Sequence, residues 1–247
     1  MIIKQLTATL FCLSTVLTSL QLKADEGVNF IGEVSTSNKS IDFYTTDGGT
    51  GGKVHFAPDI LTLDYAGTLS YQNFYSRIKI SQTIMDDKVL FRTLTFMNRS
   101  DQDFTLGYYI GGGISMFAGY KRGEFEAFVE GDSSNPSVRA RFVDSGAFAG
   151  ASYSVSFEAS SLALTLAYAD MDGEISVQSN GSQKTTGDTT GYSFSVTWSK
   201  PITDATSFTA GINATRYEFE DSDLGIGLDF GTEQSFDSIS LGLLHYF

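Results

Sequence analysis

Two histidines are the first residues in this sequence that could carry out acid–base chemistry. A general base must lie beside a nucleophile or an activated water molecule, and neither His55 nor His245 has a nucleophile motif around it. His245 lies two residues from both Leu243 and Phe247 and so shares their side of a strand, which places it on the apolar face of its segment. We therefore expect no catalytic residues and no enzymatic activity.

Two further segments look like ligand-binding loops but lack the required spacing. A phosphate loop would need glycine at Asp47 and Ser or Thr at Val54, around the Gly-rich run that ends at Lys53. Asp170–Glu174 begins like a calcium loop without the full spacing of one. Solvated acidic residues could still share divalent ions with lipid phosphates: Glu218, Glu220, Asp221, Asp223, Asp229 and Glu233. We expect no resident metal and no cofactor.

The first 24 residues have the features of a secretory signal peptide. Lys4 is followed by an apolar run from Leu6 to Leu20, and Ala24 precedes the polar Asp25. The run is shorter than the roughly 20 apolar residues that a spanning helix needs. We expect cleavage after Ala24, which also removes Cys12, the only cysteine, so disulfides cannot hold the exported chain together.

Composition limits the class of protein. The net charge is −13, so the chain is not expected to bind nucleic acid. With 20 Phe and 12 Tyr but only 3 Pro, the chain is too aromatic to be disordered. No segment after residue 24 reads as a membrane-spanning helix. The chain is therefore either a soluble β protein or one that crosses a membrane as strands.

Alternation of residue types favours the membrane. In Gly191–Ser199, the aromatic and apolar residues Tyr192, Phe194, Val196 and Trp198 alternate with Ser and Thr. The polar faces of this and similar segments hold Ser, Thr, Gly and Ala rather than Lys and Glu, which suits a crowded barrel interior. Aromatic residues at strand ends are typical of the interfacial girdles of such barrels.

The sequence predicts an all-β fold, an antiparallel transmembrane β-barrel of eight strands over residues 65–247. Alternating short and long connections separate the predicted strands at 69–84, 102–111, 113–124, 142–158, 161–174, 189–200, 205–219 and 235–247. Residues 25–64 form either a periplasmic leader, a plug or an extra hairpin, with strands near Val28–Thr36 and Lys53–Tyr65. The hairpin would make ten strands, the alternative to eight.

The C-terminal segment ends on Phe247, with Leu243, Leu241 and Ile239 on one face. Together with Phe104–Tyr108, Met116–Lys121 and Gly146–Gly150, it resembles small Gram-negative outer-membrane barrels of the OmpA, OmpX and OmpW kind. This resemblance implies a location in the cell outer membrane and recognition of the C-terminal residues by the barrel assembly machinery. It supports the fold strongly and the function weakly.

Four charged residues share the parity of the polar, inward faces: Arg77, Lys79, Lys121 and Glu158. Paired charges in a narrow barrel satisfy one another, because a lone buried charge is costly. The alternative interpretation is a selective channel. Because eight strands leave an interior just wide enough for side chains, we favour a structural network over a pore.

Three functions follow from this fold. The favoured one is a structural or surface-interaction protein whose acidic extracellular loops contact lipopolysaccharide or external partners, with outer-membrane lipid around the barrel. The second is a narrow porin-like channel for small solutes, which ten strands would favour. The third is a lipid-modifying outer-membrane enzyme, which would need a catalytic cluster at the outer rim. The oligomeric state stays open.

Overall fold

The fold is described here from a computed structural model, which describes residues 27–46, 53–56, 59–86, 94–129, 137–178, 182–219 and 233–247. The expected signal peptide, residues 1–24, lies outside these ranges. None of the described residues forms a helix long and apolar enough to span a membrane.

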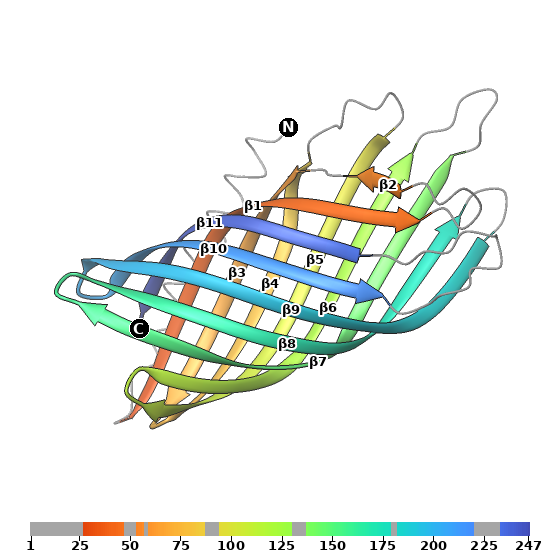
Figure 1. Ribbon diagram of the computed structural model, residues 1–247. Coiled ribbons are helices and arrows are strands. Elements are labelled where there is room, and N and C mark those ends of the chain that lie inside the picture. The colour runs from red at the N-terminus through yellow and green to blue at the C-terminus, as the bar shows by residue number, and fades with distance from the viewer. Residues whose placement is uncertain are drawn as a thin grey trace.

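Ten long antiparallel strands close into a barrel (Figure 1), because β1 pairs with both β3 and β11. An additional short strand, β2, pairs only with the far end of β1. The expectation of eight strands is therefore wrong, and the ten-strand alternative is the observed architecture. The strands are β1 (Val28–Thr46), β2 (Lys53–Phe56), β3 (Asp59–Tyr71), β4 (Phe74–Asp86), β5 (Leu94–Gly111), β6 (Ile114–Val129), β7 (Val138–Phe157), β8 (Ser160–Gln178), β9 (Ser182–Thr203), β10 (Thr206–Phe219) and β11 (Glu233–Tyr246).

The error arose in the first two barrel strands. Outward positions of β1 carry small or polar residues such as Gly32, Thr36 and Asn38, so the strand shows little contrast between its faces. The turn from β3 to β4 contains neither Gly nor Pro, and Gln72 takes the left-handed conformation there, with φ 53°. The predicted boundary between residues 64 and 65 consequently falls inside β3.

The two ends of the barrel differ in their connections. Short turns join β3 to β4, β5 to β6, β7 to β8 and β9 to β10, and we call this the short-turn end. Three consecutive glycines with positive φ, Gly111 to Gly113, make the β5–β6 turn. At the same end the backbone N–H of Phe247 donates to the carbonyl oxygen of Phe30 at 3.0 Å, so the start of β1 meets the end of β11. We call the opposite end the long-connection end.

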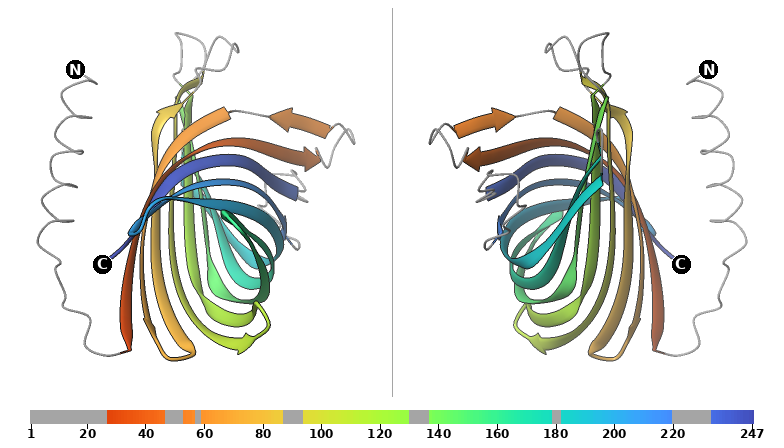
Figure 2. Two further views of the ribbon diagram at one scale, coloured as in Figure 1. Left: turned by 90° about the vertical axis from the view of Figure 1, so that its left-hand side faces the viewer. Right: turned by 90° about the vertical axis from the view of Figure 1, so that its right-hand side faces the viewer.

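A band of exposed apolar side chains surrounds the outside of the barrel near the short-turn end. Its members alternate with inward residues along each strand, as lipid-facing residues do; examples are Ile78, Ile80, Phe104, Leu106, Leu164, Leu166, Phe194, Ile212, Ile239 and Leu241. The longest strand, β9, has 22 residues, about twice the 9–11 that cross a bilayer. The strands therefore continue beyond this apolar band, toward the long-connection end. Figure 2 shows the strands of the barrel from two further sides.

Inside this extension the barrel is filled by apolar side chains. The buried cluster takes residues from most strands around the barrel: Ile41, Ile60, Met97, Phe125, Ala169, Met171, Tyr217 and Phe236. Phe125 contacts Phe142 with ring centroids 6.1 Å apart, and Tyr217 contacts Phe236 at 5.7 Å. We call this group the apolar plug, because it occupies the interior between the lumen and the long-connection end.

Candidate functional site: the barrel lumen

Below the apolar plug lies a cavity of about 660 Å³, which runs toward the short-turn end. Small polar side chains from β8, β9, β10 and β11 line one side, among them Thr165, Ser193, Ser195, Thr209 and Ser240. Charged side chains from β1, β3, β4, β5 and β6 line the other, namely Glu33, Lys39, Asp64, Arg77, Lys79, Arg99, Asp101, Asp103 and Lys121. The lining also includes apolar side chains such as Ile31, Phe117 and Phe148, and its charged residues lie on one side only.

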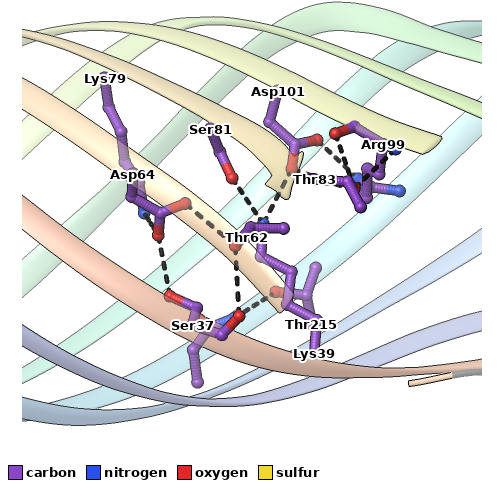
Figure 3. Close-up of polar contacts among 11 residues, drawn as sticks. Ser37, Lys39, Thr62, Asp64, Lys79, Ser81, Thr83, Arg99, Asp101 and Thr215 are labelled. Atoms are coloured by element: carbon purple, nitrogen blue, oxygen red, sulfur yellow. Dashed lines mark hydrogen bonds and ion pairs between the residues drawn. The ribbon is translucent and has the colours of Figure 1, made fainter. Parts of the chain in front are cut away.

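Asp101 is the centre of the charged layer (Figure 3). Both Arg99 and Lys39 contact its carboxylate: Arg99 Nε lies 3.0 Å from Oδ2 and Arg99 Nη2 lies 2.7 Å from Oδ1, while Lys39 Nζ lies 3.2 Å from Oδ2. Lys39 Nζ also donates to Ser81 Oγ at 2.9 Å. Arg99 and Asp101 are 4% and 7% exposed, so each needs the other to compensate its lost hydration.

Asp64 holds a second group of polar contacts beside the first (Figure 3). Its carboxylate accepts hydrogen bonds from Ser37 Oγ at 2.8 Å and from Thr62 Oγ1 at 3.2 Å, and Lys79 Nζ lies 3.4 Å away. These residues come from three consecutive strands of the sheet, β1, β3 and β4, so the cluster follows directly from the register of those strands. Ser37, Thr62 and Asp64 are buried and satisfy one another's hydrogen-bonding groups, whereas the side chain of Lys79 is 36% exposed.

Two cations extend across the lumen to aromatic rings on the far side. Arg99 on β5 lies 4.0 Å above the ring centroid of Phe236 on β11, and Lys121 on β6 lies 5.6 Å from that of Tyr217 on β10. Neither pair of strands is adjacent in the sheet. Cations favour the faces of aromatic rings, particularly where water is excluded. These contacts join the charged layer to the apolar plug and bridge the barrel at this level.

Glycines on β8 and β9 leave space for aromatic rings of β10. A Cβ at Gly191 would collide with the ring of Tyr217, and one at Gly173 would collide with the ring of Phe219. Tyr217 occupies the space beside Gly191 on the adjacent strand β9, and Phe219 extends past β9 to the space beside Gly173 on β8. The rings can therefore fill the interior at the level where Lys121 and Arg99 reach it.

Of the charged residues predicted from parity, Arg77, Lys79 and Lys121 line the cavity. Arg77 Nη2 lies 2.7 Å from Glu33 Oε2, and Lys79 pairs with Asp64 as described above. Glu158 does not belong to this network. It is exposed in the turn between β7 and β8, because the strand ends at Phe157 and alternation no longer fixes its direction.

The sequence predicted neither Lys39 nor the three most buried charged residues of the lumen, Asp64, Arg99 and Asp101. Lys39 lies in β1, which was assigned to an N-terminal leader, plug or hairpin. Arg99 and Asp101 precede residue 102, where the predicted strand began, but β5 starts at Leu94. The signal was present: Arg99, Asp101 and Asp103 share the parity of Thr105, and extending the alternation backward would have placed all of them inward.

The remaining candidate residues have no shared site. His245 lies at the short-turn end, where its Nδ1 is 2.9 Å from Thr206 Oγ1 and its ring contacts Phe247 at 4.6 Å. The side chain of His55 and residues 220–232 lie outside the described residues, as do Asp47 and the glycines after it. Among the residues that are described, no group of three or more His, Cys, Asp or Glu side chains could hold a metal ion.

The C-terminal residues lie on the outward face of β11. Ile239, Leu241 and Leu243 are 65%, 52% and 52% exposed and belong to the apolar band. The ring of Phe247 contacts that of Phe30 at 5.3 Å, at the seam that closes the barrel. Recognition of these residues during assembly stays a prediction.

Comparison with solved structures identifies the fold as that of outer-membrane β-barrel proteins. The outer-membrane protease OmpT from Escherichia coli is 12% identical, covering 91% of this chain and 98% of that chain, with a TM-score of 0.58. The translocator domain of the autotransporter NalP from Neisseria meningitidis is 9% identical over 98% and 97% of the two chains, with a TM-score of 0.45. The attachment invasion locus protein Ail of Yersinia pestis is 12% identical over 88% and 99%, with a TM-score of 0.39.

No protein-family model matches the chain, and no curated protein matches it by sequence. At 12% identity the likeness to OmpT concerns the fold alone. The role of this chain therefore has to be argued from its own lumen and surface.

Proposed function

We propose that the protein is a closed outer-membrane barrel with a structural or surface-interaction role, exported with a cleaved signal peptide. The observation that carries this proposal is the bridged lumen: Lys39–Asp101, Arg99–Phe236 and Lys121–Tyr217 each connect non-adjacent strands directly below the apolar plug. A lumen filled in this way favours function at the outer surface over passage of solutes. The long-connection end is the extracellular end in this proposal, since outer-membrane barrels keep their short turns in the periplasm.

Single-channel conductance in a planar bilayer tests this proposal. The purified barrel is first shown to be folded by the shift of its gel mobility on heating. We expect no steady current from the folded wild-type protein. The double variant Lys121→Ala/Tyr217→Ala removes one bridge and is expected to show intermittent current. The matched variant Ser195→Ala/Ser240→Ala changes the same cavity without touching a bridge and is expected to stay silent. Reproducible current steps from the wild-type barrel would overturn the proposal.

A narrow channel is the second candidate, and the cavity favours it. About 660 Å³ of polar lumen lies between the short-turn end and the charged layer, so only the bridges and the apolar plug would have to part. Wild-type current that selects by charge would support this candidate. Arg77, Lys79 and Lys121 would then be the first residues to change, because they line the cavity on its charged side.

We further propose that the barrel has no enzymatic role. The position of His245 supports this proposal, because its contacts with Thr206 and Phe247 place it at the short-turn end. That end faces the periplasm in this proposal, away from the outer leaflet in which lipid A lies. Expression of the protein in a Gram-negative host is expected to leave the mass of lipid A unchanged. A new lipid A species that depends on the folded barrel would contradict the proposal.

A further inference from the structure

Two charged side chains of the cavity lack the ion pairs that the other charged side chains have. The pairs among the lining residues are Lys39–Asp101, Arg99–Asp101, Arg77–Glu33 and Lys79–Asp64. Asp103 and Lys121 line the same cavity, and among the described residues neither forms an ion pair. Oδ1 of Asp103 is buried and has no hydrogen-bond partner among those residues. One carboxylate and one ammonium group are therefore left for a ligand.

The two groups are neighbours in the sheet. Asp103 on β5 is paired in register with Lys121 on β6 and with Lys79 on β4, and all three line the cavity. Paired residues on adjacent strands have their Cβ atoms about 5 Å apart. Lys121 nevertheless extends to the ring of Tyr217, 5.6 Å from its centroid, and Lys79 extends to Asp64 (Figure 3). Asp103 thus lies between two lysines, and neither of them holds its carboxylate.

The order of these charges favours a ligand that carries both signs. An anion would be attracted by the lysines but repelled by Asp103 between them, and a cation would be repelled by the lysines on either side. A small zwitterion can donate from its ammonium group to Asp103 and accept from Lys121 with its carboxylate, in two charge-assisted hydrogen bonds. An α-amino acid carries these two groups on one carbon atom, so it can contact charged side chains of two adjacent strands.

The cavity extends to the short-turn end and has an apolar surface beside Lys121. Its lining reaches from Tyr217 in the apolar plug to Gly113 in the β5–β6 turn. A volume of about 660 Å³ lies within the range of small-molecule sites. The ring of Phe148 also lines the cavity and lies beside Gly119, two residues from Lys121 on β6. An apolar side chain of a ligand can therefore pack next to the charged groups.

We propose that the lumen binds a small zwitterion of the α-amino acid class, which enters from the short-turn end. Its ammonium group contacts Asp103, its carboxylate group contacts Lys121, and its apolar side chain packs against Phe148. The inference goes beyond the proposed function, because it concerns the part of the lumen below the apolar plug rather than the outer surface. A barrel that is closed to passage can hold such a ligand at its periplasmic end.

Saturation-transfer NMR of the folded barrel in lipid nanodiscs, titrated with L-phenylalanine, tests the site, and empty nanodiscs serve as the blank. Two analogues separate the charges: 3-phenylpropanoate lacks the ammonium group, and 2-phenylethylamine lacks the carboxylate. We expect saturation transfer to L-phenylalanine, and binding of each analogue that is about tenfold weaker, since one charge-assisted hydrogen bond is lost. No transfer to L-phenylalanine, or equally tight binding of either analogue, would overturn the zwitterion site.

Two variants locate the site within the cavity, and the shift of gel mobility on heating shows that each is folded. Asp103→Asn keeps the shape of the side chain without its charge, and it is expected to bind L-phenylalanine about tenfold more weakly. Glu33→Gln is the matched control, because Glu33 lines the same cavity but is already paired with Arg77. It is expected to bind no more weakly than the wild type. Equal losses in the two variants would contradict the site at Asp103. Failure of binding leaves the absence of current untouched, so it would not overturn the closed barrel.

Discussion

The two walls of the lumen are built from different kinds of residue. On β1 and β3 to β6, which we call the charged wall, inward positions hold charged side chains such as Lys39, Arg99, Asp101 and Lys121. On β8 to β11, the neutral wall, the described inward positions facing the cavity are mostly Ser, Thr, Ala and Gly, with Tyr217 and Phe236 above them. Among the described residues, the ion pairs of the lumen lie within the charged wall: Lys39–Asp101, Arg77–Glu33, Lys79–Asp64 and Arg99–Asp101.

This difference shows how the interior of a ten-stranded barrel can be bridged from one side. Its interior is wider than that of an eight-stranded barrel, so small residues on both walls would leave it open. Long side chains on the charged wall reach across, and the aromatic rings of the neutral wall receive them at 4.0 and 5.6 Å. The neutral wall leaves the space into which the charged wall extends. Substitutions of similar size should therefore lower the free energy of unfolding by very different amounts on the two walls.

Removing the central carboxylate of the charged wall is expected to have the largest effect. Asp101→Ala leaves Arg99 and Lys39 buried without their shared partner, and breaking a buried pair on one side costs about 3–5 kcal/mol. Urea unfolding of the refolded protein in lipid vesicles measures the free energy of unfolding. Ser195→Ala, which faces the same cavity from the neutral wall, is expected to stay within about 0.5 kcal/mol of the wild type. Similar losses in both variants would remove the distinction between the walls.

Adding one methyl group beneath an aromatic ring is expected to have the next largest effect. A Cβ at Gly173 would collide with the ring of Phe219 and come close to Thr189 Oγ1, so Gly173→Ala forces the ring out of its place. Overpacking of this kind costs about 1–3 kcal/mol. Ala167→Ser on the same strand also adds one atom, but it faces the cavity, where space is available. The two variants are compared by the same unfolding measurement, and an equally small loss in both would mean that the aromatic rings are loosely packed.

The sequence predicted the neutral wall better than the charged wall. Strands such as β9 alternate Tyr192, Phe194 and Val196 with serines, so both their existence and their direction can be read from the residue types. This contrast is strong because the outward positions face lipid and carry apolar side chains, whereas the inward positions carry small polar ones. The class of fold and the outward face of the last strand follow from such segments.

The charged wall was harder to predict because its residues break the alternation. In β1, Glu33, Ser35, Ser37 and Lys39 face inward, but their outward neighbours are also small or polar. Arg99 and Asp101 look like part of a loop until β5 is extended to Leu94. Their burial depends on partners 62 residues apart along the chain, as in Lys39–Asp101, which no local pattern contains. The site therefore depends on which residues pair across the strands of the barrel. That pairing could not be derived from a fold with the wrong number of strands.

The smallest expected effect within the charged wall concerns Arg77 and Glu33. Their atoms Nη2 and Oε2 are only 2.7 Å apart, yet the two side chains are 36% and 22% exposed to the lumen. Water in the cavity screens such a pair, so a short distance alone does not make it strong. A double-mutant cycle with Arg77→Met and Glu33→Gln is expected to give a coupling free energy below about 1 kcal/mol. The coupling should also shrink when the unfolding is repeated at high salt, because exposed charges are screened.

A coupling free energy as large as the loss in Asp101→Ala, and insensitive to salt, would mean that the lumen is dry down to the short-turn end. Closure would then belong to the whole charged wall rather than to the layer around Asp101.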